Sequence, residues 1–279
     1  MATCTAAQER ARRFAIGLIV AHLVLALAGV LLFVPGFPDY AWPRWQCIFL
    51  EALAFAQVGM VTAILAIGSL SITYRVAAAA AVFMFWVIVF GALDLHHENW
   101  LSIFAIQMAG IGACLAVARI FGARLTCEPA PDVSSLERAK FRFSMRQILL
   151  VMASVSFLLG VATLIGKLPD FHEALDRGVL PRAKTLGVGL VPILLVAVWT
   201  TFTTGRRVTP FLLLIVVTLL AAYASADRMF RTAWWSTLTR ESYQMAYLYL
   251  VFVYALLVFL SLATLRIGGF RIGRQSENP

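Results

Sequence analysis

Apolar and polar positions alternate along the chain in long blocks. Eight apolar runs of roughly 20 residues are separated by short polar segments, and they cover residues 14–35, 46–70, 75–94, 99–121, 147–166, 184–203, 208–225 and 242–266. A helix of about 20 residues crosses a hydrocarbon core of ~30 Å and satisfies its own backbone hydrogen bonds there. The pattern therefore predicts an all-α membrane protein with eight transmembrane helices.

Composition excludes a soluble globular protein. Hydrophobic residues make up 61% of the chain and charged residues only 13%, which is far from the balance of soluble domains. The first apolar run follows Arg10, Arg12 and Arg13, as in a signal peptide, but it is longer than a signal-peptide core and no clear small-residue cleavage site follows it. We interpret it as a retained helix.

Basic residues gather on one side of the predicted helices. With the N-terminus inside, the inner segments hold 15 Lys and Arg residues and the outer segments hold 8. The positive-inside rule therefore places both termini in the cytoplasm. The net charge of +9 does not indicate nucleic-acid binding, because these residues lie mainly beside helix ends, where they attract the anionic headgroups of the lipid bilayer.

Two pairs of segments match each other within the chain. Residues 115–125, LAVARIFGARL, share six of eleven positions with residues 262–272, LATLRIGGFRI. Residues 29–40 align without a gap on residues 160–171, keeping Gly, Val, Pro and Asp. Apolar bias alone would not align the arginines and the glycine, so these matches indicate an internal duplication.

A third match pairs Arg75-Val76 with Arg207-Val208, and the three matches follow one another in the same order in both halves of the chain. The two members of a match are 131 residues apart for the segments at 29 and 160, 132 for the Arg-Val pairs and 147 for the closing motifs. We therefore expect two four-helix membrane repeats, 8–126 and 142–274, joined by a polar cytoplasmic linker at 127–141. An even number of helices makes the two repeats parallel.

The repeated closing motifs each end in arginine and glycine. An arginine at the cytoplasmic end of a helix reaches lipid phosphates with its long side chain, and Gly122 and Gly269 suit a helix C-terminus. A specific lipid or effector site is the alternative interpretation. The candidates for contact with lipid headgroups are Arg119, Arg124, Arg266 and Arg271.

The string Asp94-Leu95-His96-His97-Glu98 is the most suggestive chemically. Imidazole and carboxylate groups together bind divalent metals or pass protons, although the string matches no spacing-specific motif, and a solvated polar turn is the simpler interpretation. In the predicted topology Glu51 and His172 face the same, outer side of the membrane. The candidate metal ligands are Glu51, Asp94, His96, His97 and His172.

Three polar residues lie deep in the predicted membrane. His22, Gln57 and Gln107 fall about 18, 16 and 12 Å from the outer ends of their helices at 1.5 Å per residue. They could form an intramembrane polar cluster. Such a cluster either braces the bundle through interhelical hydrogen bonds or forms part of a substrate or proton path.

Familiar catalytic and cofactor motifs are absent from the sequence. No Gly-rich phosphate loop, nucleophile elbow, HExxH or haem-type CxxCH occurs, and the four cysteines, Cys4, Cys47, Cys114 and Cys127, have no metal-ligand spacing. We predict no cofactor, and the sequence favours a protein that is not an enzyme.

Residues 140–161, KFRFSMRQILLVMASVSFLLGV, are similar to an Arg-Phe-Ser-x-Arg-x-Leu-Leu entry into a membrane helix, with Ile148 at the first of the two leucine positions. This segment resembles uncharacterised multi-pass membrane proteins of planctomycete-type bacteria. The resemblance implies a bacterial inner-membrane protein of unknown function, and it carries no site residues.

Two classes of function remain. Parallel repeats with mid-depth polar residues that differ between them favour a small transporter or permease. A non-catalytic membrane scaffold or accessory subunit, bound to a membrane protein partner or to a second copy, needs only packed helices and an apolar surface. An outer-face metalloenzyme is a distant third.

Overall fold

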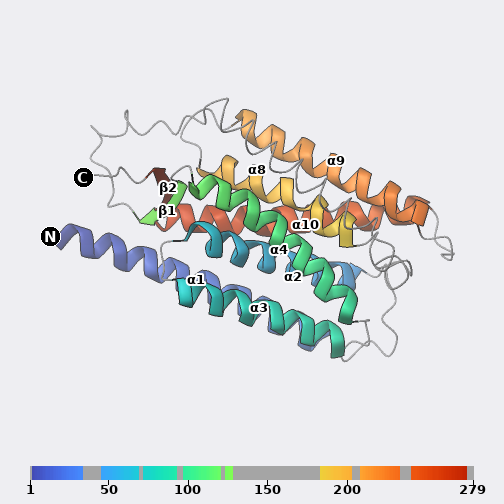
Figure 1. Cartoon of the computed structure of the whole chain (residues 1–279), viewed down its shortest axis with the longest axis horizontal. Helices are drawn as coiled ribbons and strands as arrows, with labels where there is room; N and C mark the ends of the chain where they lie inside the picture. The colour runs from blue at the N-terminus through green and yellow to red at the C-terminus, as the bar shows by residue number, and fades with distance from the viewer. Residues whose placement is uncertain are drawn as a thin grey trace.

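The computed structural model describes residues 2–33, 45–68, 72–92, 97–120, 123–127, 183–202, 208–232 and 240–274. Figure 1 shows these helices running side by side along the long axis of the molecule. The elements, in chain order, are α1 (Ala2–Phe33), α2 (Trp45–Ile67), α3 (Ile72–Ala92), α4 (His97–Ile120), β1 (Ala123–Cys127), η2 (Ala183–Val188), α8 (Val191–Phe202), α9 (Val208–Thr232), α10 (Arg240–Ile267) and β2 (Phe270–Arg274).

Six helices are long and apolar enough to cross a membrane: α1, α2, α3, α4, α9 and α10. Each coincides with an apolar run predicted from the sequence. The run 184–203 forms the π-helical turn η2 and the short helix α8, and the run 147–166 lies outside the described residues. The chain is a multi-pass membrane protein.

Helix α2 occupies the centre of the bundle. It packs against α1, α3, α4 and α10, and it is the most buried of the six candidate spans. Small residues recur along it, and they let neighbouring backbones approach closely. They are Ala52, Ala54, Ala56, Gly59 and Ala63.

An aromatic cluster joins α2, α3 and α4. The rings of Trp86 and Phe90 stack with centroids 5.6 Å apart, and Phe104 lies 6.1 Å from Phe90 and 5.5 Å from Phe55. All four side chains are fully buried. Offset and edge-to-face arrangements of this kind add to the energy of apolar burial, so the cluster fixes how these three helices pack.

The outer faces of the bundle are apolar. Helices α1, α3 and α9 expose large hydrophobic side chains along much of their length, such as Leu31, Ile88 and Leu220. Such a surface is unfavourable in water and is the expected boundary with lipid acyl chains. The fold thus agrees with contact between these helices and a lipid bilayer.

The described ends of the chain lie at the same end of the bundle, which also carries β1 and β2 (Figure 1). We call this the sheet end. That both termini lie in the cytoplasm stays a prediction.

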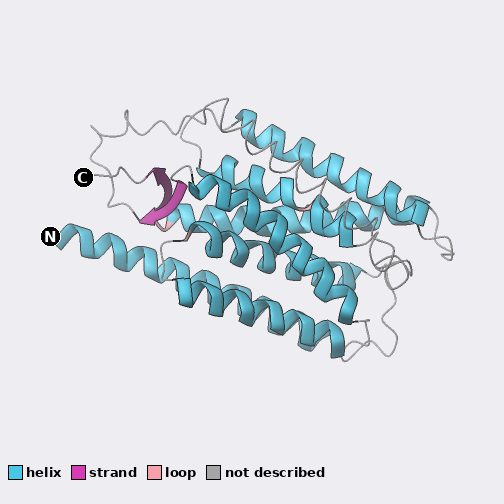
Figure 2. Ribbon diagram, in the orientation of Figure 1, coloured by secondary structure: helices cyan, strands magenta, loops and turns pink. Residues whose placement is uncertain are grey.

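Helices α4 and α10 each lead into a short strand, and the two strands pair antiparallel (Figure 2). The central pair of the ladder is Leu125 opposite Ile272. Helix α10 ends at Ile267, and Gly269 lies in the turn that follows it; its φ of 98° suits glycine, and its amide donates to the Arg266 carbonyl at 3.1 Å. The prediction that Gly269 suits a helix C-terminus is confirmed, whereas Gly122 lies outside the described residues.

The strand pair corrects the expectation of a purely helical chain. Arg124 and Arg271, which were predicted to contact lipid headgroups, have their backbones in the ladder, opposite Gly273 and Thr126. Such short strands carry too little periodic signal to stand out from a polar loop. The directions of these two arginine side chains lie outside the described structure.

Candidate functional site

A first polar group lies between α1, α2, α3 and α10. His22 Nε2 is 2.8 Å from Ser261 Oγ. The Gln57 amide bonds at both ends: Nε2 donates to the His22 carbonyl at 2.9 Å, and Oε1 accepts from Trp86 Nε1 at 2.9 Å. We call His22, Gln57, Trp86 and Ser261 the His22 group. It links four helices through side-chain hydrogen bonds.

The proton on His22 can be placed from its neighbour. Ser261 Oγ donates its single hydrogen to the Leu257 carbonyl at 2.7 Å. Its oxygen must therefore accept from His22, so the neutral imidazole carries its proton on Nε2. The other ring nitrogen, Nδ1, is an acceptor that is buried with no hydrogen-bond partner among the described residues.

A second polar group lies deeper in the bundle. Gln107 is fully buried, and its Nε2 donates to the Phe55 carbonyl at 3.0 Å. The same side chain is hydrogen-bonded to the Tyr254 hydroxyl, which donates to the Leu190 carbonyl at 3.3 Å. We call Gln107 and Tyr254, with these two carbonyl groups, the Gln107 group. It joins α4, α10 and α2 to the segment between η2 and α8.

The Gln107 group keeps one acceptor without a donor. Gln107 Oε1 is buried and has no hydrogen-bond partner among the described residues. A buried polar atom in this state costs about 1–3 kcal/mol. A donor on a bound molecule would remove that cost, which makes this atom the strongest indication of a ligand in the described bundle.

Gly59 creates the room for the Gln107 group. A Cβ atom at this position would lie 2.9 Å from Leu194 Cδ1 and 3.3 Å from both Gln107 Nε2 and Tyr254 Oη. Even a single methyl group here would force these side chains to shift. The absence of a side chain on α2 therefore permits the amide and the hydroxyl to meet.

An irregular turn precedes the Leu190 carbonyl. Residues Ala183–Val188 form the π-helical turn η2, and Gly187 seats it closely on α4, since an added Cβ there would lie 2.9 Å from Ile106 Cγ2 and 3.1 Å from the Ile103 carbonyl oxygen. Turns of π-helix are rare and occur often at functional sites. The turn brings the Leu190 carbonyl to Tyr254.

Arg119 and Arg266 each bond to the end of another helix. Arg119 Nη1 donates to the Ala66 carbonyl of α2 at 2.7 Å, and Arg266 Nη1 donates to the Thr201 carbonyl of α8. The last carbonyl groups of a helix have no partner within it, and the helix dipole favours positive charge there. Both arginines, which were predicted to contact lipid headgroups, thus use at least one N–H for a hydrogen bond within the protein.

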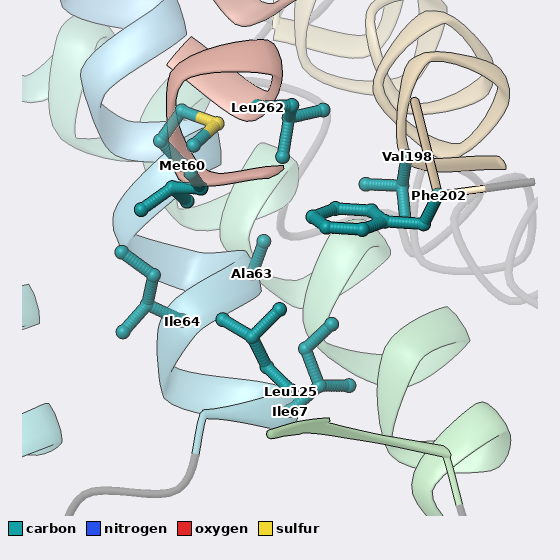
Figure 3. A pocket seen from close by; sticks show the side chains of 9 residues that line it. Met60, Ala63, Ile64, Ile67, Leu125, Val198, Phe202 and Leu262 are labelled. Carbon is teal, nitrogen blue, oxygen red and sulfur yellow. The ribbon is translucent and has the colours of Figure 1, made fainter. Parts of the chain in front are cut away.

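An apolar hollow lies beneath β1 at the sheet end. Figure 3 shows the Phe202 ring reaching towards Ala63, with Leu125 and Ile67 on one side and Met60 and Leu262 on the other. Its lining is wholly hydrophobic and comes from α2, β1, α8 and α10: Met60, Ala63, Ile64, Ile67, Leu125, Val198, Phe202, Leu262 and Leu265. We assign it no polar ligand.

The structure brings together only some of the predicted site residues. His22 and Gln57 are directly bonded, whereas the bonds of Gln107 go to Tyr254 and the Phe55 carbonyl. Among the predicted metal ligands, Glu51 is buried in α2. The described residues contain no group of three potential metal ligands. Asp94, His96, His172 and the side chain of His97 lie outside the described structure.

Sequence reasoning missed three residues of these groups, Trp86, Tyr254 and Ser261. A signal for Tyr254 existed, because it follows Gln107 by the same offset that separates the two closing motifs. Trp86 and Ser261 carried no signal, since the rotation of each helix decides which of its residues face inwards.

No protein-family model, curated protein or solved structure matches this chain.

The His22 group should behave as one coupled unit. We expect His22→Ala and Ser261→Ala each to destabilise the protein by about 0.6–2 kcal/mol, the range for hydrogen bonds between membrane helices. The double variant should lose less than the sum, because both changes remove the same bond. Thermal unfolding in detergent measures this, and strict additivity would contradict the contact.

Proposed function

We propose that the chain is a small membrane transporter made of two parallel four-helix repeats. Two pairs of hydrogen bonds support the repeats. The donors of the first pair, Arg119 and Arg266, are separated by the same offset as the closing motifs, and so are the donors of the second pair, Gln107 and Tyr254. Arg119 and Gln107 donate to carbonyl groups of α2, whereas Arg266 and Tyr254 donate to carbonyl groups of the η2–α8 segment. The two acceptor residues of the first pair are separated by the same number of positions as the two acceptor residues of the second pair.

The strand ladder supports the same proposal. Leu125 and Ile272, its central pair, occupy equivalent positions of the two closing motifs. An antiparallel ladder centred on two equivalent residues has a local two-fold axis at that pair. Helix α2 packs on α10, and η2 with α8 packs on α4, as a two-fold axis between the repeats requires.

The polar centre of the bundle supports transport. In transporters with internal repeats, substrate sites lie near the middle of the membrane where the repeats meet. Gln107 and Tyr254 meet in this way, and each is equally far along the chain from the last residue of its helix, Ile120 or Ile267, at the sheet end. The unpartnered Gln107 Oε1 is the observation that carries the proposal.

The chemistry of this centre favours an uncharged polar solute. The Gln107 group offers amide, hydroxyl and carbonyl groups and contains no charged side chain. A buried charge would need compensation that these groups supply poorly. We place the protein in a bacterial inner membrane with both termini in the cytoplasm, as the distribution of basic residues favours.

Flux through proteoliposomes tests the proposal. Radiolabelled glycerol and urea serve as probes, and a pH-sensitive dye reports protons. We expect at least one of the two solutes to enter faster than into protein-free liposomes, and Gln107→Leu to abolish this while the protein stays folded. Thr264→Val is the matched control, because Thr264 is partly exposed on α10 and its hydroxyl donates to the Leu260 carbonyl of its own helix.

The scaffold is the competing outcome. A folded, reconstituted protein that speeds none of the probes and co-purifies with a stoichiometric protein partner would contradict transport and favour a scaffold. Gln107→Leu would then change stability alone.

A further inference from the structure

Two arginines meet at the sheet end of α2. Arg119 of α4 donates to the Ala66 carbonyl, and Arg75 of α3 donates to the preceding carbonyl, that of Leu65. Adjacent acceptors on one helix end hold the two guanidinium groups next to each other. Arg75 is buried, with 6% of its surface exposed, and Arg119 is partly exposed.

The pair concentrates positive charge. Arg75 and Arg119 lie close enough for their charges to repel each other. The C-terminal dipole of α2 offsets only about half an elementary charge. Among the described residues Arg119 forms no ion pair with a carboxylate, since the described ion pair joins Arg13 to Glu9. An anion beside both groups would relieve the repulsion.

The chemistry of the pair selects a phosphate group. A guanidinium has five N–H donors in a planar fork that matches phosphate oxygens, and one carbonyl bond leaves most of the donors of Arg119 available. Apolar side chains flank the pair: Ile72, Tyr74 and Val76 on α3 and Ile120 on α4 are all at least half exposed. Charge beside an exposed apolar face is the arrangement that suits a lipid headgroup with its acyl chains.

We propose that Arg75 and Arg119 together bind a phosphate group, carried by an anionic lipid or present as a free ion. This site is separate from the Gln107 group, and it does not depend on whether the protein transports a solute.

The test is the thermal stability of the purified protein in detergent with three probes. Phosphatidylglycerol carries the phosphate, dioleoylglycerol has similar acyl chains without it, and inorganic phosphate is the soluble anion. We expect phosphatidylglycerol to raise the Tm of the wild type by roughly 5 °C more than dioleoylglycerol does, the shift for a ligand well above its Kd. High salt should reduce the difference.

Two variants distinguish the site from general charge. Arg119→Gln should lose the phosphate-dependent shift. Arg13→Gln should keep it, because Arg13 is an exposed arginine of α1 that pairs with Glu9 at 3.1 Å. If Arg119→Gln does not fold, the test uses Arg119→Lys together with the comparison of the lipids on the wild type. Lysine keeps the positive charge but lacks the planar fork of donors, so we expect phosphatidylglycerol to raise the Tm of Arg119→Lys by less than it raises the Tm of the wild type.

The possible results separate the sources of the phosphate. A shift with phosphatidylglycerol alone assigns the site to a lipid headgroup, and an equal shift with inorganic phosphate assigns it to a soluble anion. The proposal is overturned if phosphatidylglycerol and dioleoylglycerol act alike and inorganic phosphate has no effect. It is also overturned if Arg119→Gln keeps the full shift, or if Arg13→Gln loses as much as Arg119→Gln.

Discussion

Gly59→Val is expected to destabilise the protein by about 3 kcal/mol, the upper part of the range for overpacked cores. The new Cβ would meet Leu194 Cδ1 at 2.9 Å, and Leu194 is fully buried, so its side chain has little room to move away. Gln107 Nε2 and Tyr254 Oη, each at 3.3 Å, would also have to yield. The bond between the amide and the hydroxyl should be lost with the packing.

Tryptophan fluorescence during heating in detergent measures this loss. Gly17→Val is the matched control, because an added Cβ at Gly17 on α1 meets nothing within 4 Å. The control should unfold close to the wild-type temperature. Equal destabilisation by both variants would show that valine in a helix, rather than the contact at Gly59, causes the effect.

Trp86→Ala is expected to have a still larger effect, a loss of about 3–5 kcal/mol. Trp86 is fully buried, stacks on Phe90 and donates to Gln57 Oε1. Alanine would leave a cavity among the aromatic rings and would also leave the Gln57 amide oxygen without its donor.

Trp86→Phe separates these two losses. Phenylalanine keeps a ring in the cluster and removes the N–H, so we expect about 1–3 kcal/mol from the unpaired amide oxygen. Chemical or thermal unfolding monitored by circular dichroism measures both variants. If Trp86→Phe is as destabilising as Trp86→Ala, the hydrogen bond rather than the packing dominates, and the cavity argument is wrong.

Much of the fold could be predicted from the apolar runs, because a membrane helix needs a length that few other structures require. Helix ends were less predictable. Helix α1 begins at Ala2, not near residue 14. Its first residues are rich in helix formers and include the i,i+4 pair of Glu9 and Arg13, so the helix continues beyond its apolar part.

The strand pair was out of reach for a different reason. Each strand is short, and its partner lies far away along the chain, one after α4 and the other after α10, so no local pattern announces the pairing. The internal duplication that the sequence predicts relates these same segments, but similarity between two segments does not predict that they touch.

The candidate site was predictable only in part. Polar side chains within apolar runs identified His22, Gln57 and Gln107, because such residues are costly in lipid unless they face a partner. Tyr254 is amphipathic and lies within an apolar run, so its hydroxyl does not interrupt the run. The Ser261 hydroxyl donates to the Leu257 carbonyl of its own helix, as an isolated serine in a helix can, so its type alone does not indicate a contact with another helix. Which side chains meet depends on the rotation and depth of each helix, and the sequence alone does not give these.

The strand ladder ties α4 and α10 together at one end only. Helix α10 has 28 residues, so it extends about 42 Å at 1.5 Å per residue. If the two helices pivot at the ladder by about 5°, their far ends separate by about 4 Å, but the Gln107 group, near the middle of α10, opens by only about 2 Å. That displacement is enough to break a hydrogen bond while the ladder stays closed. Such a pivot would open the bundle as a wedge, widest at the end away from the sheet.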